Sequence, residues 1–185
     1  MNRVAVFYCL AQLALHGDAA LAQAYPQKTI QFVVATAPSG GTDAVGRLIA
    51  QKLSEALGQN VVVDNRPGAS GSIGSALVAK AAPDGYALLV ANVGHVAMNP
   101  AIARVPFDTL RDFTPVTLLA SGPLILITHP SVPAKNVREL VALARSKPGR
   151  LNYSTGGSGT TSHFGMELFK SGTMTDIVHI PFKGI

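Results

Sequence analysis

Residues 33–43, VVATAPSGGTD, determine how the rest of this chain is organised. The apolar, β-branched run that leads into them predicts a buried strand over residues 29–35, which Pro38 and the glycines after it cannot continue. Apolar residues at helical spacing then predict a helix over residues 42–57, capped by Thr42 or Asp43. Such a turn directs backbone N–H groups and the positive end of a helix toward one point, which suits an anion.

A second glycine-rich turn follows the same plan. Residues 151–163, LNYSTGGSGTTSH, predict a strand over 151–154, a turn over 156–161 and a helix over 162–170. We expect the two turns to face each other across a cleft and to hold a small carboxylate. Asp43 has two compatible roles: it can cap the first helix, or it can receive an ammonium or hydroxyl group of a ligand.

Between the two turns, strands and helices alternate. Residues 61–63 and 86–91 predict two further strands, and residues 72–81 predict the helix between them. Gly58 is expected to end the first helix. The β-α-β-α-β order predicts an α/β fold with a parallel sheet, whose ligands bind beyond the carboxyl ends of the strands.

The pattern changes after residue 92. Two strands are predicted over residues 113–119 and 124–129, then a helix over 136–146 with Asn136 and Glu139 as its cap, and a last strand over 177–180. We therefore expect a first lobe over residues 25–118 and a partial second lobe over 119–185. Because that second lobe would have few strands and no return path to the first, we interpret the chain as a fragment of a longer one.

Residues 1–24 are predicted to be a signal peptide. Arg3 precedes a short apolar run, and Ala22-Gln23-Ala24 is typical of a cleavage site, so the mature chain of an exported protein would begin at Tyr25. A first amphipathic helix is the alternative. Cys9 would be removed with this segment, which leaves neither a thiol nor a disulfide.

Composition narrows the classes of function. The chain has 185 residues, of which 48% are hydrophobic and 14% charged, as in a globular protein. Its net charge is +5, but the basic residues are scattered, which argues against nucleic-acid binding and favours anionic ligands. The turns lack the lysine of a P-loop, the full Rossmann glycine pattern and the serine-hydrolase elbow. The histidines lack the short spacing of metal ligands. We expect no cofactor and no metal.

Several short motifs resemble the Bug-type periplasmic substrate-binding receptors of the tripartite tricarboxylate transporter family. They occur in the same order and span residues 25–185: Tyr25-Pro26, Ala37-Pro38-Ser39-Gly40-Gly41-Thr42-Asp43, Leu57-Gly58-Gln59, Asn65-Arg66-Pro67-Gly68-Ala69, Pro83-Asp84-Gly85-Tyr86, Asn99-Pro100, Asp112-Phe113 and His179-Ile180-Pro181-Phe182-Lys183-Gly184. The resemblance implies a two-lobe, Venus-flytrap fold of type II, here with an incomplete second lobe. It also implies a monomeric receptor that passes organic acids to a membrane permease.

The resemblance also implies which residues hold the ligand, largely through backbone amides and ordered water. In the first turn these are Pro38, Ser39, Gly40, Gly41, Thr42 and Asp43, and in the second Gly157, Ser158, Gly159, Thr160 and Thr161. Selectivity is expected to depend on side chains around the cleft: Thr36, Ser39, Asn92, His95 and His163.

Two alternatives remain open at this point. The chain could be an α/β enzyme acting on a small carboxylate, such as an isomerase or a hydrolase, with Asp43 and His163 as its titrating pair. It could also be a truncated, non-functional product. A receptor needs no nucleophile and base, and none is visible in the sequence, so a binding protein without catalysis is the preferred interpretation.

Overall fold

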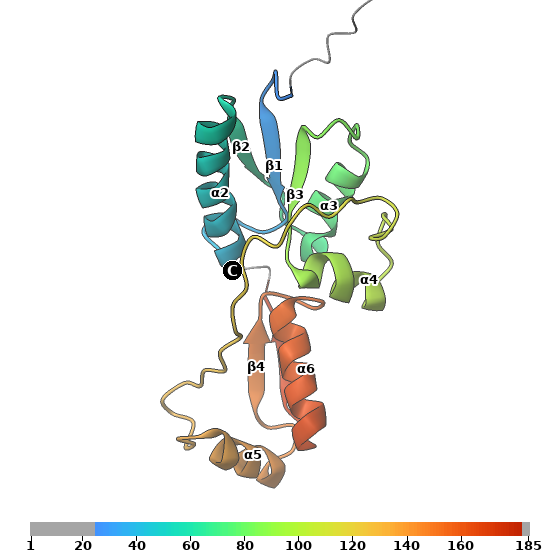
Figure 1. Cartoon of the computed structure of the whole chain (residues 1–185). Coiled ribbons are helices and arrows are strands. Elements are labelled where there is room, and N and C mark those ends of the chain that lie inside the picture. The colour runs from blue at the N-terminus through green and yellow to red at the C-terminus, as the bar shows by residue number, and fades with distance from the viewer. Residues whose placement is uncertain (1–24, 183–185) are drawn as a thin grey trace, which may run out of the picture.

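The computed structural model describes residues 25–182, so the expected signal peptide lies outside the described residues. The chain forms two lobes, one above the other in Figure 1, and each is built on a parallel sheet. This arrangement confirms the predicted two-lobe α/β fold.

The first lobe contains strands β1 (Ile30–Val34), β2 (Val61–Asn65) and β3 (Ala87–Val90) in the order β2-β1-β3, all parallel. Because β1 lies in the middle and is covered on both faces, its four apolar side chains are almost fully buried, while Gln31 is half-buried and donates to Asp64. Ile30, Phe32 and Val34 form a core cluster with Ala50 and Val90.

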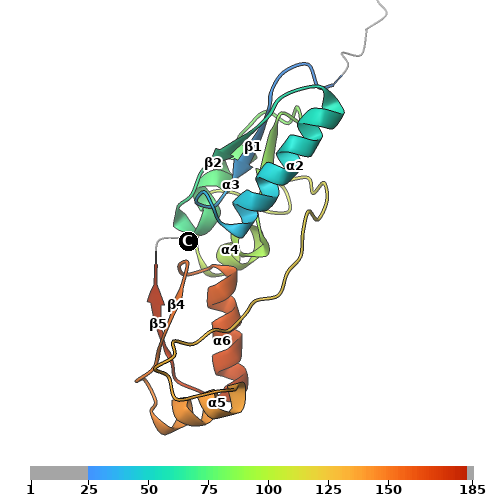
Figure 2. The same ribbon diagram turned by 90° about the vertical axis from the view of Figure 1, so that its left-hand side faces the viewer.

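Helices α2 (Gly41–Leu57) and α3 (Ser72–Ala79) lie on the two sides of this sheet (Figures 1 and 2). Each of these helices packs closely against the sheet at a glycine. A Cβ on Gly46 would lie 3.1 Å from Val34, and a Cβ on Gly74 would lie 3.1 Å from the Cα of Ala35. Successive side chains of a strand point to opposite faces, so Val34 and Ala35 meet different helices.

Two short helical segments and α4 (Asn99–Ile102) close the lower end of the first lobe. These segments are η1 (Ala69–Gly71) and η2 (Gly94–Met98). Each follows a strand, η1 after β2 and η2 after β3, so both lie at the carboxyl edge of the sheet.

Residues 103–136 connect the lobes and run along the outside of the molecule in Figure 2. The prediction of strands over 113–119 and 124–129 is wrong, because this segment has no regular secondary structure. Its composition suits a strand, but a strand is stable only when a neighbour pairs with its N–H and C=O groups. Within residues 25–182, no strand pairs with it. The predicted lobe boundary at residue 118 lies in this segment and stays a prediction.

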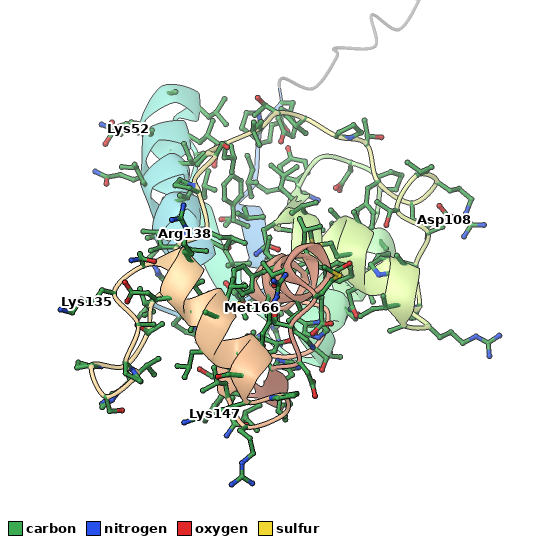
Figure 3. The ribbon with its side chains drawn as sticks, turned by 90° about the horizontal axis from the view of Figure 1, so that it is seen from below. Lys52, Asp108, Lys135, Arg138, Lys147 and Met166 are labelled. Carbon is green, nitrogen blue, oxygen red and sulfur yellow. The ribbon has the colours of Figure 1, made fainter. Side chains whose placement is uncertain are left out.

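The second lobe contains α5 (Val137–Ser146), β4 (Asn152–Thr155), α6 (Thr161–Thr173) and β5 (Val178–Pro181), with β4 parallel to β5. Leu140, Ala144 and Ile177 form its buried core. Figure 3 shows α5 across the lower end of the molecule, where the basic side chains of Lys135, Arg138 and Lys147 extend outward.

The remaining predicted helices and strands are confirmed to within three residues at each end. Asn136 caps α5, accepting the Glu139 amide at 3.0 Å, while Glu139 accepts the Lys135 amide at 2.8 Å. Gly58 ends α2 at a φ of +64°, a conformation that glycine adopts without strain. Among the described residues, no helix is both long enough and apolar enough to cross a membrane.

Candidate functional site

Both glycine-rich turns lie at the boundary between the lobes. In Figure 1 the strand β1 runs downward and α2 begins at its lower end, whereas β4 points upward and α6 begins at its upper end. The carboxyl ends of the two sheets and the amino ends of these two helices therefore face the same boundary. This is where ligands of open α/β sheets bind.

The first turn is organised by Asp43. The prediction that Thr42 or Asp43 caps α2 is wrong: the N-cap residue is Gly40, which makes no side-chain cap bond. Asp43 lies inside the first helical turn, where its carboxylate accepts the Ser39 amide at 2.8 Å. This bond holds Ser39 at a φ of +72°, in the left-handed region, and so closes the turn.

Asp43 is almost fully buried, and its carboxylate makes two further bonds. Arg47 Nε donates to it at 3.0 Å and Asn65 Nδ2 at 2.9 Å. The bond from Arg47, then that from the Ser39 amide, lowers the pKa of Asp43 to about 2. The Asp43 carboxylate is therefore ionised, and its hydrogen bonds to other groups of the protein stabilise the turn.

The enzyme alternative depended on Asp43 and His163 as a pair. Within residues 25–182, no hydrogen bond or ion pair joins these two side chains. A carboxylate with a pKa near 2 is also a weak proton acceptor at neutral pH.

The amides at the start of α2 remain available to an anion. The N–H groups of Gly41, Thr42 and Asp43 have no acceptor among the described residues, whereas the Ser39 amide is used by Asp43. Of the residues predicted for the first turn, these three at the start of α2, and Gly40 before them, can therefore donate directly to a carboxylate.

The second turn uses several of its own amides internally. Gly157 donates to Thr155 Oγ1 at 3.2 Å, Gly159 to His163 Nδ1 at 3.3 Å, and Thr160 to the Gly157 carbonyl at 3.4 Å. Thr160 caps α6 by accepting the His163 amide. In the part of the chain that the structure describes, the amides of Ser158 and Thr161 have no acceptor.

A stack of three rings supports the second turn. His163 lies on His179 at a centroid distance of 4.4 Å, and His179 lies on Tyr153 at 4.7 Å. His179 Nε2 is 2.6 Å from Thr155 Oγ1, the hydroxyl that also accepts the Gly157 amide. Burial, and then the neighbouring His163, lowers the pKa of His179. His163 therefore stabilises the second turn by stacking on His179 and by accepting the Gly159 amide.

Three residues of the first lobe meet the second turn. Ser70 Oγ donates to the Ser158 carbonyl, and Thr161 Oγ1 donates to Asn92 Oδ1 at 3.5 Å. Asn99 lies close to Gly159: a Cβ on Gly159 would be 2.9 Å from the Asn99 Oδ1. Ser70 and Asn99 are not among the residues predicted to form the site. The Asn65-Arg66-Pro67-Gly68-Ala69 and Asn99-Pro100 motifs were the available signal.

The other residues predicted to control selectivity line the first lobe. Thr36 Oγ1 is buried without a partner at the end of β1. His95 is 4% exposed and its Nδ1 accepts the Asn92 amide at 3.3 Å. Burial lowers the pKa of His95 to about 4, so the ring is neutral at physiological pH. Their role in selectivity stays a prediction.

The two turns do not share either of two cavities beside the boundary. One, of about 680 Å³, is lined by α3, α4 and residues 103–106 and reaches Ser70 and Ser158. The other, of about 890 Å³, lies in the second lobe between residues 124–129 and β4. Neither is lined by residues 36–43, so the predicted facing of the turns across a common cleft stays a prediction. Residues 25–182 contain no cluster of three or more potential metal ligands.

Comparison with known proteins identifies the family. A sequence profile described as the tripartite tricarboxylate transporter family receptor matches residues 45–185. The chain belongs to this receptor family. Membership confirms the resemblance inferred from the motifs, and the family is one of receptors rather than enzymes.

Relatives of this receptor-family chain include Protein BugT of Bordetella pertussis, which is 37% identical over 88% of the chain and 51% of its own length. Among solved structures, R. palustris Rpa4515 with adipate matches with 39% identity and a TM-score of 0.82, covering 86% of this chain and 54% of that one. MatC of Rhodopseudomonas palustris with bound malate matches with 33% identity and a TM-score of 0.79, covering 86% and 55%. The chain thus spans about half the length of these relatives.

Proposed function

We propose that this chain carries the ligand-holding turns of a periplasmic receptor for a small organic dicarboxylate, which it delivers to a tripartite tricarboxylate-type permease. The observation that carries the proposal is the unused amides at the amino ends of α2 and α6, both at the lobe boundary. Two solved relatives hold dicarboxylates, adipate and malate.

The free energies of the individual contacts support binding of a carboxylate by backbone amides without an arginine. A hydrogen bond to a charged group contributes about 1.5–3 kcal/mol, and a helix terminus adds about 0.3–1 kcal/mol. Three amides from the start of α2 and two from the second turn would contribute about 8–17 kcal/mol in total, which reaches the roughly 8 kcal/mol of a micromolar complex when the entropic cost of association is near the lower end of about 4–15 kcal/mol.

A charge placed over the amides of α2 tests the site. A Cβ on Gly41 would meet no atom within 4 Å, so Gly41→Glu fits the fold while it brings a carboxylate to the amides that an anion would use. Gly122→Glu adds the same charge on the connecting segment, where a Cβ also meets nothing. We expect calorimetry to show adipate or malate binding in the parent chain and in Gly122→Glu, and at least tenfold weaker binding in Gly41→Glu.

The opposite result would reject the proposal. If no acid in a panel of di- and tricarboxylates raises the melting temperature of the folded parent chain, the anion site has no support. If Gly41→Glu binds as tightly as Gly122→Glu, the ligand lies elsewhere.

A further inference from the structure

We propose that Ser70, positioned by Asn99, latches the second glycine-rich turn to the first lobe and sets how long the lobes stay closed on a ligand. The inference rests on the proposed receptor function for its ligand, but the contact itself is within the chain. Ser70 Oγ donates to the Ser158 carbonyl, across the boundary and 88 residues along the sequence.

The loop that presents Ser70 is held in an uncommon shape. Four consecutive residues have positive φ: Gly68 at +117°, Ala69 at +46°, Ser70 at +51° and Gly71 at +84°. Two of them are not glycine, and such conformations persist only where the surroundings impose them. The loop therefore does not adopt this shape on its own.

Asn99 supplies that constraint. Its side chain is 5% exposed, and Nδ2 lies 2.8 Å from Ser72 Oγ, 3.2 Å from the Ala69 carbonyl and 3.4 Å from the Ser70 carbonyl. The other side of the same amide faces Gly159 in the second turn. One buried side chain thus fixes the Ser70 loop and forms the surface on which the second turn rests.

The two backbones meet without room for a side chain. A Cβ on Gly94 would lie 3.0 Å from the Thr161 amide nitrogen, and a Cβ on Gly159 would lie 2.9 Å from Asn99 Oδ1. Since Thr161 begins α6, an added methyl group at Gly94 would push the amino end of that helix away from the first lobe.

The latch uses the carbonyl of Ser158 and leaves its N–H available. Within residues 25–182, no hydrogen bond joins the Ser70 side chain to the first turn. Loosening the latch should therefore open the lobes equally for every ligand, whereas loss of a ligand contact would change the ranking of the acids.

The test compares Ser70→Ala and Gly94→Ala in the full chain with two controls on α6. Ser171→Ala removes an exposed hydroxyl that has no partner within residues 25–182, and Gly172→Ala adds a methyl group in open space. Without ligand, we expect hydrogen exchange of residues 154–164 to be two- to tenfold faster in both latch variants, the range for loss of one hydrogen bond. Neither control should exchange faster than the parent chain.

With ligand, dissociation of adipate and of malate should accelerate by the same factor in Ser70→Ala; Gly94→Ala also displaces the Thr161 amide proposed for the ligand, so hydrogen exchange alone is compared for that variant. Unchanged exchange in both variants overturns the latch, as does acceleration for one acid alone. If the parent chain binds neither acid, the proposed function fails, and the exchange measurement still decides the latch.

Discussion

At the scale of single residues, Asp43 connects the first turn to its surroundings. Its carboxylate joins the Ser39 amide, Arg47 and Asn65, which come from the turn, the helix α2 and the end of β2. The sequence left Asp43 two compatible roles, one structural and one toward a ligand; its three hydrogen bonds show the structural role, and the role toward a ligand stays a prediction. The Arg47 side chain four positions later on the helix was the signal in the sequence for the structural role.

Replacing Asp43 should therefore affect stability first. In Asp43→Asn the charge opposite Arg47 is lost and one of the three donors loses its acceptor, so we expect a loss of about 1–3 kcal/mol and a lower melting temperature. Asp176→Asn, at an exposed site, is the control and should change little. An unchanged melting temperature combined with lost ligand binding would show instead that Asp43 serves the ligand.

Acid should weaken the fold in two steps. Burial in the folded protein lowers the pKa of His95 from 6.5 to about 4. Between these two pH values, His95 is protonated in the unfolded chain but neutral in the folded protein. This costs up to about 3 kcal/mol as the pH falls from about 6.5 to about 4, and His179 adds to the same window. The pKa of Asp43 falls from 3.8 to about 2, so its contribution is complete above pH 4 and is lost as the pH falls through 2.

Urea unfolding measured between pH 7 and pH 4.5 checks the first step. Stability should decline with acid in the parent chain and decline less in His95→Gln, while His129→Gln, at an exposed site, should behave like the parent. Equal slopes in all three chains would contradict the assignment to His95.

At the scale of helices and strands, the sequence predicted those elements whose signals are local. The helix α2 ending at Gly58 and the Asn136–Glu139 cap depend on neighbours within a few residues, and the strand β1 was predicted correctly because β2 and β3 are present to pair with it. The strands expected over 113–119 and 124–129 depend on partners elsewhere in space, which a pattern of apolar residues does not specify. The Ser70–Ser158 contact was missed for the same reason, because no local periodicity relates residues 88 positions apart.

The contact of α3 with the sheet gives a prediction at this scale. In Gly74→Ala the new methyl group would lie 2.9 Å from the Arg66 carbonyl and 3.1 Å from the Cα of Ala35, both backbone atoms that cannot rotate away. We expect a loss of about 1–3 kcal/mol despite the better helix propensity of alanine. Gly172→Ala on α6, in open space, should instead gain up to about 1 kcal/mol in urea unfolding. Stabilisation by both changes would mean that α3 does not pack this closely.

At the scale of the whole molecule, the connecting segment exposes an unusual amount of apolar surface. Val116, Leu118, Ile125 and Ile127 are each at least 80% exposed. Exposed apolar side chains of this kind promote association or contact with further polypeptide. The expectation that the protein is a monomer stays a prediction, and this segment argues against it at high concentration.

Charge placed on this segment should reduce that association. We expect the chain to bind a hydrophobic dye and to show concentration-dependent light scattering, and Ile125→Lys with Ile127→Lys to lower both. Leu168→Lys is the control, because Leu168 is 76% exposed but lies on α6, outside the segment. Equal scattering of the double variant and the control would show that the segment does not mediate association.

The head-to-head arrangement of the lobes has an electrostatic consequence. The amino ends of α2 and α6, each with roughly half a positive charge, approach the same boundary and therefore repel each other. Asp43 offsets little of this repulsion, because Arg47 already balances its charge. An anion that enters the boundary removes the repulsion and acts as a counter-ion for both helices. A ligand with two carboxylates can neutralise both ends at once, so closure of the lobes should be sensitive to the number of charges on the ligand as well as to its shape.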